Sequence, residues 1–338
     1  MPHAWSFVCP ATFQMRIGIR IGCLLAIAVS ALANPSSGSA QVGGFTSFDV
    51  PGASLTRPFD VNNSGAVVGF YTGQVGTHGF VLNQGKYTTV DFPGAVLTAV
   101  MGINDLGQLV GRFQTEEGVD HGFLLSNGVF RQIDFPGSIS TQCHGINKKG
   151  QIVGRYFSVE NPAQGGGQGL AHEHGFLLTG NSFTSIDFPD ADTTDAWKIT
   201  DDGDIVGDWT RNGALNSGSL HGYVMHDGRY SSFDFPGAAG TAGRDINAGG
   251  ELVGVLYDKK CVIPLGHSFV LVNGSYESFD FPGSACTNAQ GVNNAGVIVG
   301  AYADSSGAQH GYLASLNQKQ MTLHRDSSAN TKKIDAGL

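Results

Sequence analysis

Histidine and aspartate recur in this sequence at a fixed spacing, which makes them the first candidates for chemistry. Each of the first five motif histidines, which begin a His-Gly-Phe or similar triplet, precedes a motif aspartate by 13 residues. The histidines are His78, His121, His174, His221, His267 and His310, and the aspartates are Asp49, Asp91, Asp134, Asp187, Asp234 and Asp280. Such residues could bind a metal or transfer protons, but residues repeated in every copy usually stabilise the unit itself. Because buried His and Asp side chains need hydrogen-bond partners, we expect structural His–Asp pairs that join neighbouring strands.

A second set of candidate residues occupies a position whose residue type differs between copies of the repeat. One position in each copy, three residues before an Asn or its Thr200 equivalent, holds a different side chain every time. These residues are Phe59, Met101, His144, Trp197, Arg244 and Gln290. We predict that they surround the mouth of a central channel and bind a polar ligand with stackable faces, such as a glycan or a peptide. Irregular packing between the copies is the alternative.

Two sets of aspartates suggest further sites. The first set could bind calcium, which favours clusters of oxygen ligands, and it comprises Asp187, Asp190, Asp192 and Asp195. A solvated acidic loop is the alternative. A glycosidase needs two carboxylates that face one cleft. The acids that could supply them are Asp60, Asp195 and Asp245.

Cysteine usage predicts one disulfide. Cys9 and Cys23 lie in the N-terminal segment described below, which leaves three cysteines in the rest of the chain. We predict a bridge between Cys261 and Cys286, with Cys143 as the free thiol. The spacing of these cysteines does not match a structural zinc site.

The elements that position these residues form a repeated unit. Each motif aspartate precedes the glycine of a Val-Gly pair by 20 residues in all six copies, whereas the distance from that glycine to the next motif histidine varies from 9 to 20 residues. Alternating apolar residues and turn signals predict four strands per copy. In the second copy these are 98–104, 108–113, 121–126 and 130–135, the last after an Asn127-Gly128 hairpin signal. Four short strands in about 45 residues are typical of a propeller blade.

The two ends of the repeat region predict how the structure closes. The chain enters the pattern at the last strand of a unit, 45–49, and leaves it after a third strand, 311–316. Pairing of these segments would complete the last unit and remove an exposed sheet edge. We therefore predict an all-β fold, a six-bladed β-propeller of four-stranded blades whose N-terminal strand closes the last blade. An open β-solenoid is the structural alternative.

The N-terminus predicts export. Arg16 and Arg20 precede a short apolar stretch, 21–33, that ends in Ala31-Leu32-Ala33, as in a secretory signal peptide. The expected organisation is a signal peptide at 1–33, a linker at 34–44, the propeller at 45–316, and a polar, disordered tail at 317–338. The stretch is shorter than the roughly 20 apolar residues of a membrane-spanning helix, so we expect no membrane span in the mature chain.

Charge narrows the choice of partners. Loss of the signal removes two arginines and no acidic residue, which changes the net charge of the chain from −9 to −11. An acidic protein without a basic stripe repels phosphate backbones, so we expect no nucleic-acid binding. A monomer is the expected state.

Three motifs carry a resemblance to a known family. Asp-Phe-Pro-Gly, Gly-Ile-Asn-x-x-Gly-x-Ile-Val-Gly and His-Gly-Phe recur in fixed order, and the chain resembles the bacterial "probable extracellular repeat, HAF family". The resemblance covers nearly the whole mature chain, although this sequence has His-Gly-Phe or His-Ser-Phe where the family name implies His-Ala-Phe. It implies export, and it brings no established activity or ligand.

These observations favour a secreted, non-catalytic binding or surface-interaction protein, located extracellularly or in the periplasm. Its partner would be a glycan or an extracellular protein, and calcium is the one candidate cofactor. The alternative is a carbohydrate-active enzyme, a glycosidase or lyase, built on a propeller. We find no nucleophile elbow, dinucleotide fingerprint or zinc-protease motif.

Overall fold

The computed structural model describes residues 41–159, 171–211, 220–258, 261 and 265–316. The regular elements within these ranges are 24 strands, and the ranges contain no helix that could cross a membrane. The all-β prediction is therefore confirmed. The predicted signal peptide at 1–33, most of the 34–44 linker and the predicted tail at 317–338 lie outside the described residues.

The strands repeat in groups of four, as the alternation in the sequence predicts. The first strands of the groups are β2 (Leu55–Val61), β6 (Leu97–Ile103), β10 (Ser140–Ile146), β14 (Thr193–Ile199), β18 (Gly240–Ile246) and β22 (Cys286–Val292). The second strands are β3 (Val67–Thr72), β7 (Leu109–Gln114), β11 (Ile152–Val159), β15 (Ile205–Thr210), β19 (Leu252–Tyr257) and β23 (Val297–Ala303). The third strands are β4 (Thr77–Asn83), β8 (Asp120–Ser126), β12 (Ala171–Thr179), β16 (Leu220–His226), β20 (His267–Val272) and β24 (Gln309–Leu316). The fourth strands are β5 (Lys86–Val90), β9 (Val129–Ile133), β13 (Ser182–Ile186), β17 (Arg229–Phe233), β21 (Ser275–Phe279) and β1 (Val42–Phe48).

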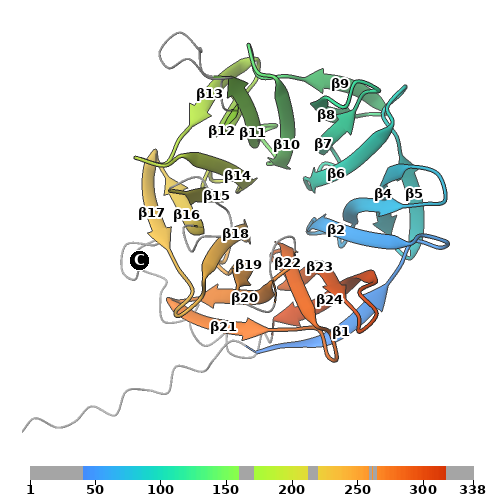
Figure 1. Ribbon diagram of the computed structural model, residues 1–338, viewed down its shortest axis with the longest axis vertical. Coiled ribbons are helices and arrows are strands. Elements are labelled where there is room, and N and C mark those ends of the chain that lie inside the picture. Colours follow the sequence, from blue (N-terminus) through green and yellow to red (C-terminus); the bar gives the residue numbers. More distant parts are fainter. Residues whose placement is uncertain (1–40, 160–170, 212–219, 259–260, 262–264, 317–338) are drawn as a thin grey trace, which may run out of the picture. The chain divides into compact units, whose positions relative to one another are not determined.

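Each group is an antiparallel sheet in which consecutive strands pair. Four groups are separate sheets, and the groups β2–β5 and β6–β9 are joined into one sheet by a single parallel bridge between Thr77 and Leu97. Figure 1 shows the groups around a common centre, with β2, β6, β10, β14, β18 and β22 nearest to it. The first strand of every group therefore supplies the side chains that face the middle of the molecule.

The last group combines the two ends of the repeat region. β1 pairs with β24 in antiparallel register, from Val42 opposite Leu316 to Phe48 opposite Gly311, and the sheet continues through β23 to β22. β1 begins at Val42, three residues before the expected start of the repeat region at residue 45. The strand starts earlier because Val42 and Phe45 pack against the apolar cluster that contains Tyr312 and Leu316.

Aromatic side chains explain why the sequence repeats in register. The third residue of each His-Gly-Phe-type triplet is completely buried, as at Phe123 and Phe176. In four groups the phenylalanine of the Asp-Phe-Pro motif stacks on an aromatic ring of the second strand, with ring centroids 3.6 Å apart for Phe92 and Phe113. Phe113 in turn stacks on the motif histidine His121. The motifs are therefore successive layers of one packing arrangement.

The glycine of the Val-Gly pair is required by close packing of the first two strands. A Cβ atom on Gly111 would lie 2.0 Å from the carbonyl oxygen of Ala99, and one on Gly154 would lie 2.0 Å from that of Gln142. The first strands also carry a register shift, or bulge, at their centres, as between Val100 and Gly102. Bulges redirect side chains locally, and here the bulge includes the position with six different residues.

Candidate functional site

The motif histidines and aspartates form pairs between the third and fourth strands. In all six pairs, Nδ1 of the histidine lies 2.7–2.9 Å from a carboxylate oxygen of the motif aspartate. His310 pairs with Asp49, which lies 261 positions earlier in the chain. Hydrogen bonding to Asp49 raises the pKa of His310, and the bond to Asp91 raises that of His78. Each histidine therefore has a structural partner.

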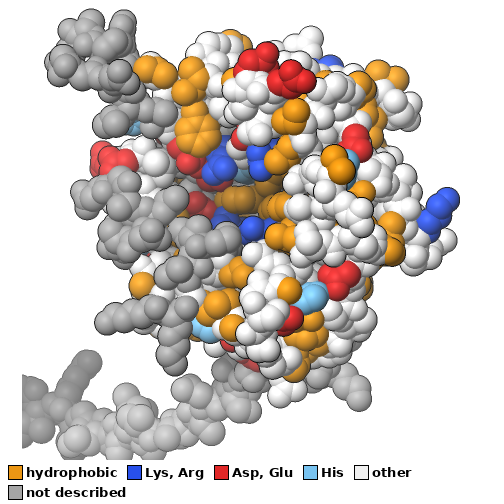
Figure 2. Space-filling view, turned by 45° about the vertical axis from the view of Figure 1, so that its right-hand side comes forward, with side chains coloured by type: hydrophobic (Ala, Val, Ile, Leu, Met, Phe, Trp, Pro, Cys, Tyr) orange, Lys and Arg blue, Asp and Glu red, His pale blue; other side chains and the backbone are white. Residues whose placement is uncertain are grey.

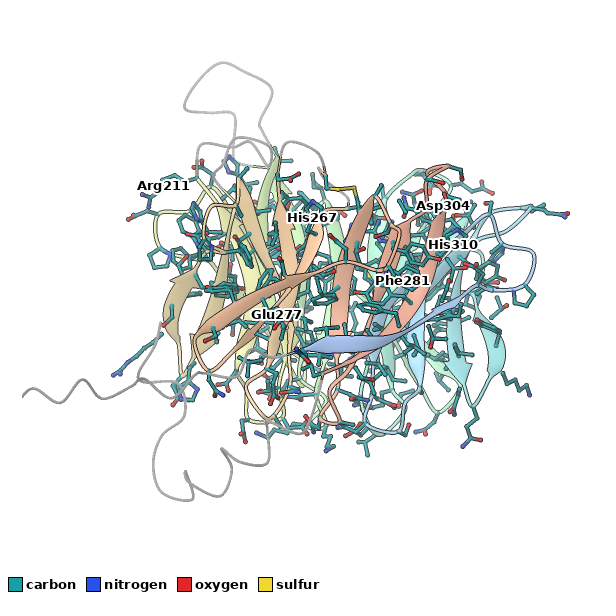
Figure 3. All side chains as sticks on the ribbon, turned by 90° about the horizontal axis from the view of Figure 1, so that it is seen from below. Arg211, His267, Glu277, Phe281, Asp304 and His310 are labelled. Carbon is teal, nitrogen blue, oxygen red and sulfur yellow. A yellow bond between two sulfur atoms is a disulfide. The ribbon has the colours of Figure 1, made fainter. Side chains whose placement is uncertain are left out.

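The motif histidines mark one face of the molecule. Figure 3 places His267, His310 and Asp304 toward one edge of the strands, which we call the histidine face. The turns between first and second strands lie at the opposite edge, which we call the asparagine face. On the histidine face a threonine hydroxyl also accepts a hydrogen bond from the backbone N–H of the residue after each motif aspartate, as Thr98 does from Phe92 at 3.0 Å. The same bond recurs in every group.

The asparagine face is held together by side-chain amides that connect neighbouring groups. The asparagine that follows each first strand donates from Nδ2 to the backbone oxygen of its equivalent in the next group, and we call this set the asparagine ring. The bonds run from Asn62 to Asn104, Asn104 to Asn147, Asn147 to Thr200, Asn247 to Asn293, and Asn293 to Asn62. Thr200 has no amide to donate, so the step from Thr200 to Asn247 lacks this bond.

A cavity of about 950 Å³ lies inside the asparagine ring. Its wall includes the ring asparagines together with Lys198 and Asp245. Lys198, on β14, forms ion pairs with Asp60 on β2 and, at 3.7 Å, with Asp245 on β18. Burial alone would lower the pKa of Lys198, but the two carboxylates outweigh it and the pKa is raised. Burial raises the pKa of Asp245 to about 7. We call Asp60, Lys198 and Asp245 the lysine triad.

The position with six different residues splits into two sets. Met101, His144 and Gln290 are buried, with exposed fractions of 7%, 1% and 4%, so they are not accessible to a ligand. Phe59, Trp197 and Arg244 are partly exposed. The structure therefore leaves three of the six predicted ligand-binding residues at the surface, and packing between groups accounts for the other three.

Trp197 is sandwiched between two neighbours. The His144 ring stacks on the indole at a centroid distance of 4.3 Å, and the Arg244 guanidinium lies 4.1 Å from the indole centroid. Because His144 and Arg244 come from the groups on either side of β14, they cover opposite faces of the ring. Neither face of the indole is therefore free to stack on a ligand.

Asp208 on β15 fixes this stack. Its Oδ2 accepts hydrogen bonds from Trp197 Nε1 at 2.9 Å and from Arg244 Nη1 at 2.7 Å, and Arg244 also reaches Tyr257 at 3.5 Å. Burial raises the pKa of Asp208 to about 6, although Arg244 acts in the opposite direction. Burial lowers the pKa of His144, so its ring is neutral at neutral pH.

A second charged network adjoins the stack. Arg155 Nη1 lies 3.2 Å from Glu173 and 3.4 Å from Asp195, and its Nη2 donates to Gln142 at 3.0 Å. Gln142 donates to Asp120, which pairs with Arg112 at 2.6 Å. Burial raises the pKa of Glu173 to about 7 despite the nearby Arg155. The network therefore runs through the first, second and third strands of neighbouring groups.

Asp195 lies next to both Arg155 and His144, so it joins the two networks into one cluster. Figure 2 shows a hollow at the centre of the visible face, with Lys or Arg side chains in its walls, Asp or Glu beside them and hydrophobic side chains at its base. Two guanidinium groups lie over aromatic rings, Arg57 over Phe59 and Arg155 over Phe157, at 5.6 and 5.5 Å. We call the following set the mouth cluster: Arg57, Phe59, Arg112, Asp120, Gln142, His144, Arg155, Phe157, Glu173, Asp195, Trp197, Asp208, Arg244 and Tyr257.

The aspartates considered for calcium are not gathered at one point. Asp187 pairs with His174, Asp190 with Arg211, and Asp195 with Arg155 and His144. No group of three or more metal-ligating side chains occurs in the part of the chain that the structure describes.

The acids considered for catalysis are also separated. Asp60 and Asp245 belong to the lysine triad, whereas Asp195 belongs to the mouth cluster, and each is buried to at least 97%. Of the three, Asp245 lines the cavity on the asparagine face. This arrangement does not bring Asp195 into one cleft with the other two.

Cys261 and Cys286 form a disulfide, with a Cα–Cα distance of 5.8 Å. It joins the segment after β19 to the start of β22, so it ties two neighbouring groups together on the histidine face. Cys143 is free and completely buried. Burial raises the pKa of its thiol far above the ordinary value, so Cys143 is not reactive.

Sequence reasoning identified Arg244 and Asp195 as candidates but missed Lys198, the other three mouth arginines and the acids Asp120, Glu173 and Asp208. A signal was present, because the residue after each Val-Gly pair also varies between copies: Phe70, Arg112, Arg155, Asp208, Val255 and Ala301. Lys198 stands where three other copies have glycine, at Gly102, Gly145 and Gly291. The variable positions of both inner strands, taken together, would have identified most of the mouth cluster.

Comparisons with known proteins support the fold class. No protein-family model matches the sequence, and no curated protein matches it. A putative TolB from Agrobacterium tumefaciens is structurally similar, with a TM-score of 0.53, 15% identity, and coverage of 83% of this chain and 99% of that chain. The β-propeller domain of the Trilobed protease from Pyrococcus furiosus has a TM-score of 0.47 and 9% identity, covering 79% of this chain and 94% of that domain. Aleuria aurantia lectin has a TM-score of 0.47 and 8% identity, covering 80% of this chain and 96% of the lectin. At these identities the likeness concerns the fold alone, which is propeller-like.

Proposed function

We propose that this protein is an exported six-bladed β-propeller that binds a ligand at its mouth cluster without catalysing a reaction. In this proposal each group of four strands is a blade, and β1 completes the last one. Three contacts between the ends of the repeat region support closure: the pairing of β1 with β24, the His310–Asp49 pair and the bond from Asn293 to Asn62.

Export is supported by two independent features. Arg16, Arg20 and the apolar stretch 21–33 have the pattern of a signal peptide. The Cys261–Cys286 disulfide suits an oxidising compartment, where such bonds persist. We also propose, from the three recurring motifs, that the chain is an extracellular repeat protein of the HAF type, located outside the cell or in the periplasm.

The observation that carries the binding proposal is the difference between repeated and variable residues. The repeated His, Asp, Thr and Asn side chains are used in hydrogen bonds within the fold. The partly exposed arginines and aromatic rings of the mouth cluster stand at positions that vary between copies, and Figure 2 shows a hollow with Lys or Arg side chains in its walls. Binding sites commonly combine a rigid scaffold with variable residues at one end, and this hollow has that composition.

The ion pairs made by the three candidate catalytic acids favour non-catalytic binding over hydrolysis. Asp60 and Asp245 are held by Lys198, and Asp195 is held by Arg155. A glycosidase instead needs two carboxylates that face one substrate-binding cleft. The ligand is therefore a glycan or a peptide that is bound and released unchanged.

The test is a binding screen followed by mapping. The mature protein, starting at Asn34, is screened on arrays of neutral and acidic glycans and of peptides, and a hit is mapped by amide hydrogen exchange. We expect protection in β2 and β11, next to Phe59 and Phe157. Protection centred on the asparagine ring, or the absence of any binder, would contradict the proposal.

A further inference from the structure

Arginines are concentrated at the mouth of the channel although the protein is acidic. Seven arginines occur between residues 41 and 316, and four of them belong to the mouth cluster. These four come from strands near the centre, Arg57 from β2, Arg112 from β7, Arg155 from β11 and Arg244 from β18. An arginine-rich hollow in a chain of net charge −9 is an attractive site for an anion.

The arginines lie nearer to solvent than most of the acids that they pair with. The Arg155 side chain is 27% exposed, compared with 17% for Glu173 and 3% for Asp195. Arg112 is 24% exposed and its partner Asp120 is 16% exposed. In the Arg244–Asp208 pair the two side chains are similarly buried, with exposed fractions of 10% and 12%. A ligand that enters the hollow therefore meets guanidinium groups before it meets carboxylates.

The balance of charge in the cluster favours an anion at neutral pH. Four arginines face four acids, but burial raises the pKa of Glu173 to about 7 and that of Asp208 to about 6. Part of the negative charge is therefore neutralised by protons. Burial and the nearby Arg244 lower the pKa of Arg57 to about 10, which still leaves Arg57 cationic and close to a second guanidinium.

The remaining groups suit a saccharide. Sugar hydroxyls both donate and accept hydrogen bonds, and the Arg155–Glu173 and Arg112–Asp120 pairs offer donors and acceptors side by side. Phe59 and Phe157 are partly exposed, and the apolar face of a sugar ring packs on such aromatic rings. Arginine forms forked hydrogen bonds to a carboxylate.

We propose that the mouth cluster binds an acidic saccharide, whose carboxylate is held by the mouth arginines and whose ring packs against Phe59 or Phe157. This inference rests on the proposed function and specifies its ligand class. Arg57 and Arg112 are the arginines to test, because Arg155 and Arg244 also compensate buried acids. Loss of one charged hydrogen bond weakens binding by about tenfold or more.

The experiment uses matched pairs of probes on the mature protein. Galacturonic acid tetramers are compared with galactose tetramers made from them by carboxyl reduction, and sialyllactose is compared with lactose, by calorimetry at low salt. Arg57→Gln and Arg112→Gln are measured beside Arg229→Gln, which removes the same charge from an exposed site on β17. Two mouth variants are used so that a folding defect in one leaves the other informative.

We expect an acidic probe to bind, its neutral counterpart to bind at least about tenfold more weakly, and each mouth variant to lose about tenfold in affinity. Arg229→Gln should bind as the unchanged protein does. Equal affinity for acidic and neutral probes, or binding of peptides alone, would overturn the inference and leave the proposed binding function intact. Failure of the acidic probes overturns the inference, and failure of every glycan and peptide on the arrays overturns the proposed function as well.

Discussion

The two ends of the central channel are built in opposite ways. At the asparagine face, five of six groups contribute the same residue, and its amide side chain connects one group to the next. At the histidine face, the mouth cluster draws on residues that differ from copy to copy, such as Arg57, Arg155 and Arg244. Both ends are polar, so polarity alone does not identify a binding site. The comparison indicates that repetition builds the scaffold and that variety builds the site.

Each end also contains a buried charged group that stabilises the fold. The lysine triad links β2, β14 and β18 at one end, and Arg244 links β18 to Asp208 on β15 at the other. The Arg244–Asp208 and Lys198–Asp245 pairs both connect the group of Thr200 to the group of Asn247, the two groups between which the asparagine ring is interrupted. Ion pairs therefore connect these two groups, which lack the amide bond.

The largest expected effect is on the lysine triad. Lys198→Met leaves the buried carboxylates of Asp60 and Asp245 without their cation, and we expect it to lower the free energy of unfolding by about 3–5 kcal/mol. Urea denaturation measures the loss, and Lys149→Met, at an exposed site, is the control. Because the triad lies at the asparagine face, ligand affinity of the folded protein should not change. A stable variant that no longer binds ligand would reverse the roles assigned to the two ends.

Asn293→Ala tests whether the ring closes. The substitution removes the amide bond to Asn62 and the acceptor that Asn293 provides for two backbone N–H groups. We expect it to cost about 2 kcal/mol in unfolding free energy. Asn247→Ala removes the equivalent bond to Asn293 and the same two backbone acceptor contacts, between groups that are consecutive in the chain. The two costs should agree to within about 0.5 kcal/mol, whereas a much smaller cost at Asn293 would indicate an open ring.

Glu173→Gln should change how stability depends on pH. The ordinary pKa of a glutamate is 4.5, and the folded value for Glu173 is about 7. Between pH 4.5 and about 7, Glu173 is ionised in the unfolded chain but still protonated in the folded protein. Unfolding therefore releases a proton, and the free energy of unfolding falls as pH rises through this range. Arg155, Asp195 and Asp208 are its charged neighbours and stay in place in the variant. From pH 5 to pH 8 the variant should lose about 1–2 kcal/mol less stability than the unchanged protein.

The measurement is urea denaturation at both pH values, with Glu116→Gln at an exposed loop position as the control. The control should follow the unchanged protein. Parallel pH profiles for Glu173→Gln and the unchanged protein would show that Glu173 is ionised in the folded state, and the charge balance inferred for the mouth would fail.

The smallest effect is a gain in stability. Thr200 accepts backbone hydrogen bonds from Gly203 and Asp204 through its hydroxyl, as the ring asparagines do through Oδ1. Thr200→Asn keeps an acceptor there and adds an amide that can reach the backbone oxygen of Asn247. We expect about 1 kcal/mol of added stability, measured by denaturation. A loss of stability would show that the Thr200–Asn247 step has a different geometry from the others.

The sequence predicts the repeated features better than the variable ones. The His–Asp pairs, the threonine bonds and the four-strand groups follow from fixed spacings, because each depends on residues within one unit or on the next unit along the chain. Lys198 could not be matched to Asp60 and Asp245 in this way, since these residues come from three groups and meet across the channel. The covered faces of Trp197 likewise depend on His144 and Arg244 in neighbouring groups.

The most direct test of the mouth as the binding site uses Trp197 as a reporter. Trp197 and Trp209 are the tryptophans beyond the predicted signal peptide. Trp209→Phe places in β15 the residue that β7 has at the equivalent position, Phe113, and leaves Trp197 alone in the mouth cluster. Titration of this variant with a saccharide that binds by calorimetry should change the Trp197 emission with the same affinity. Calorimetric binding that leaves this emission unchanged would place the ligand elsewhere and contradict the account.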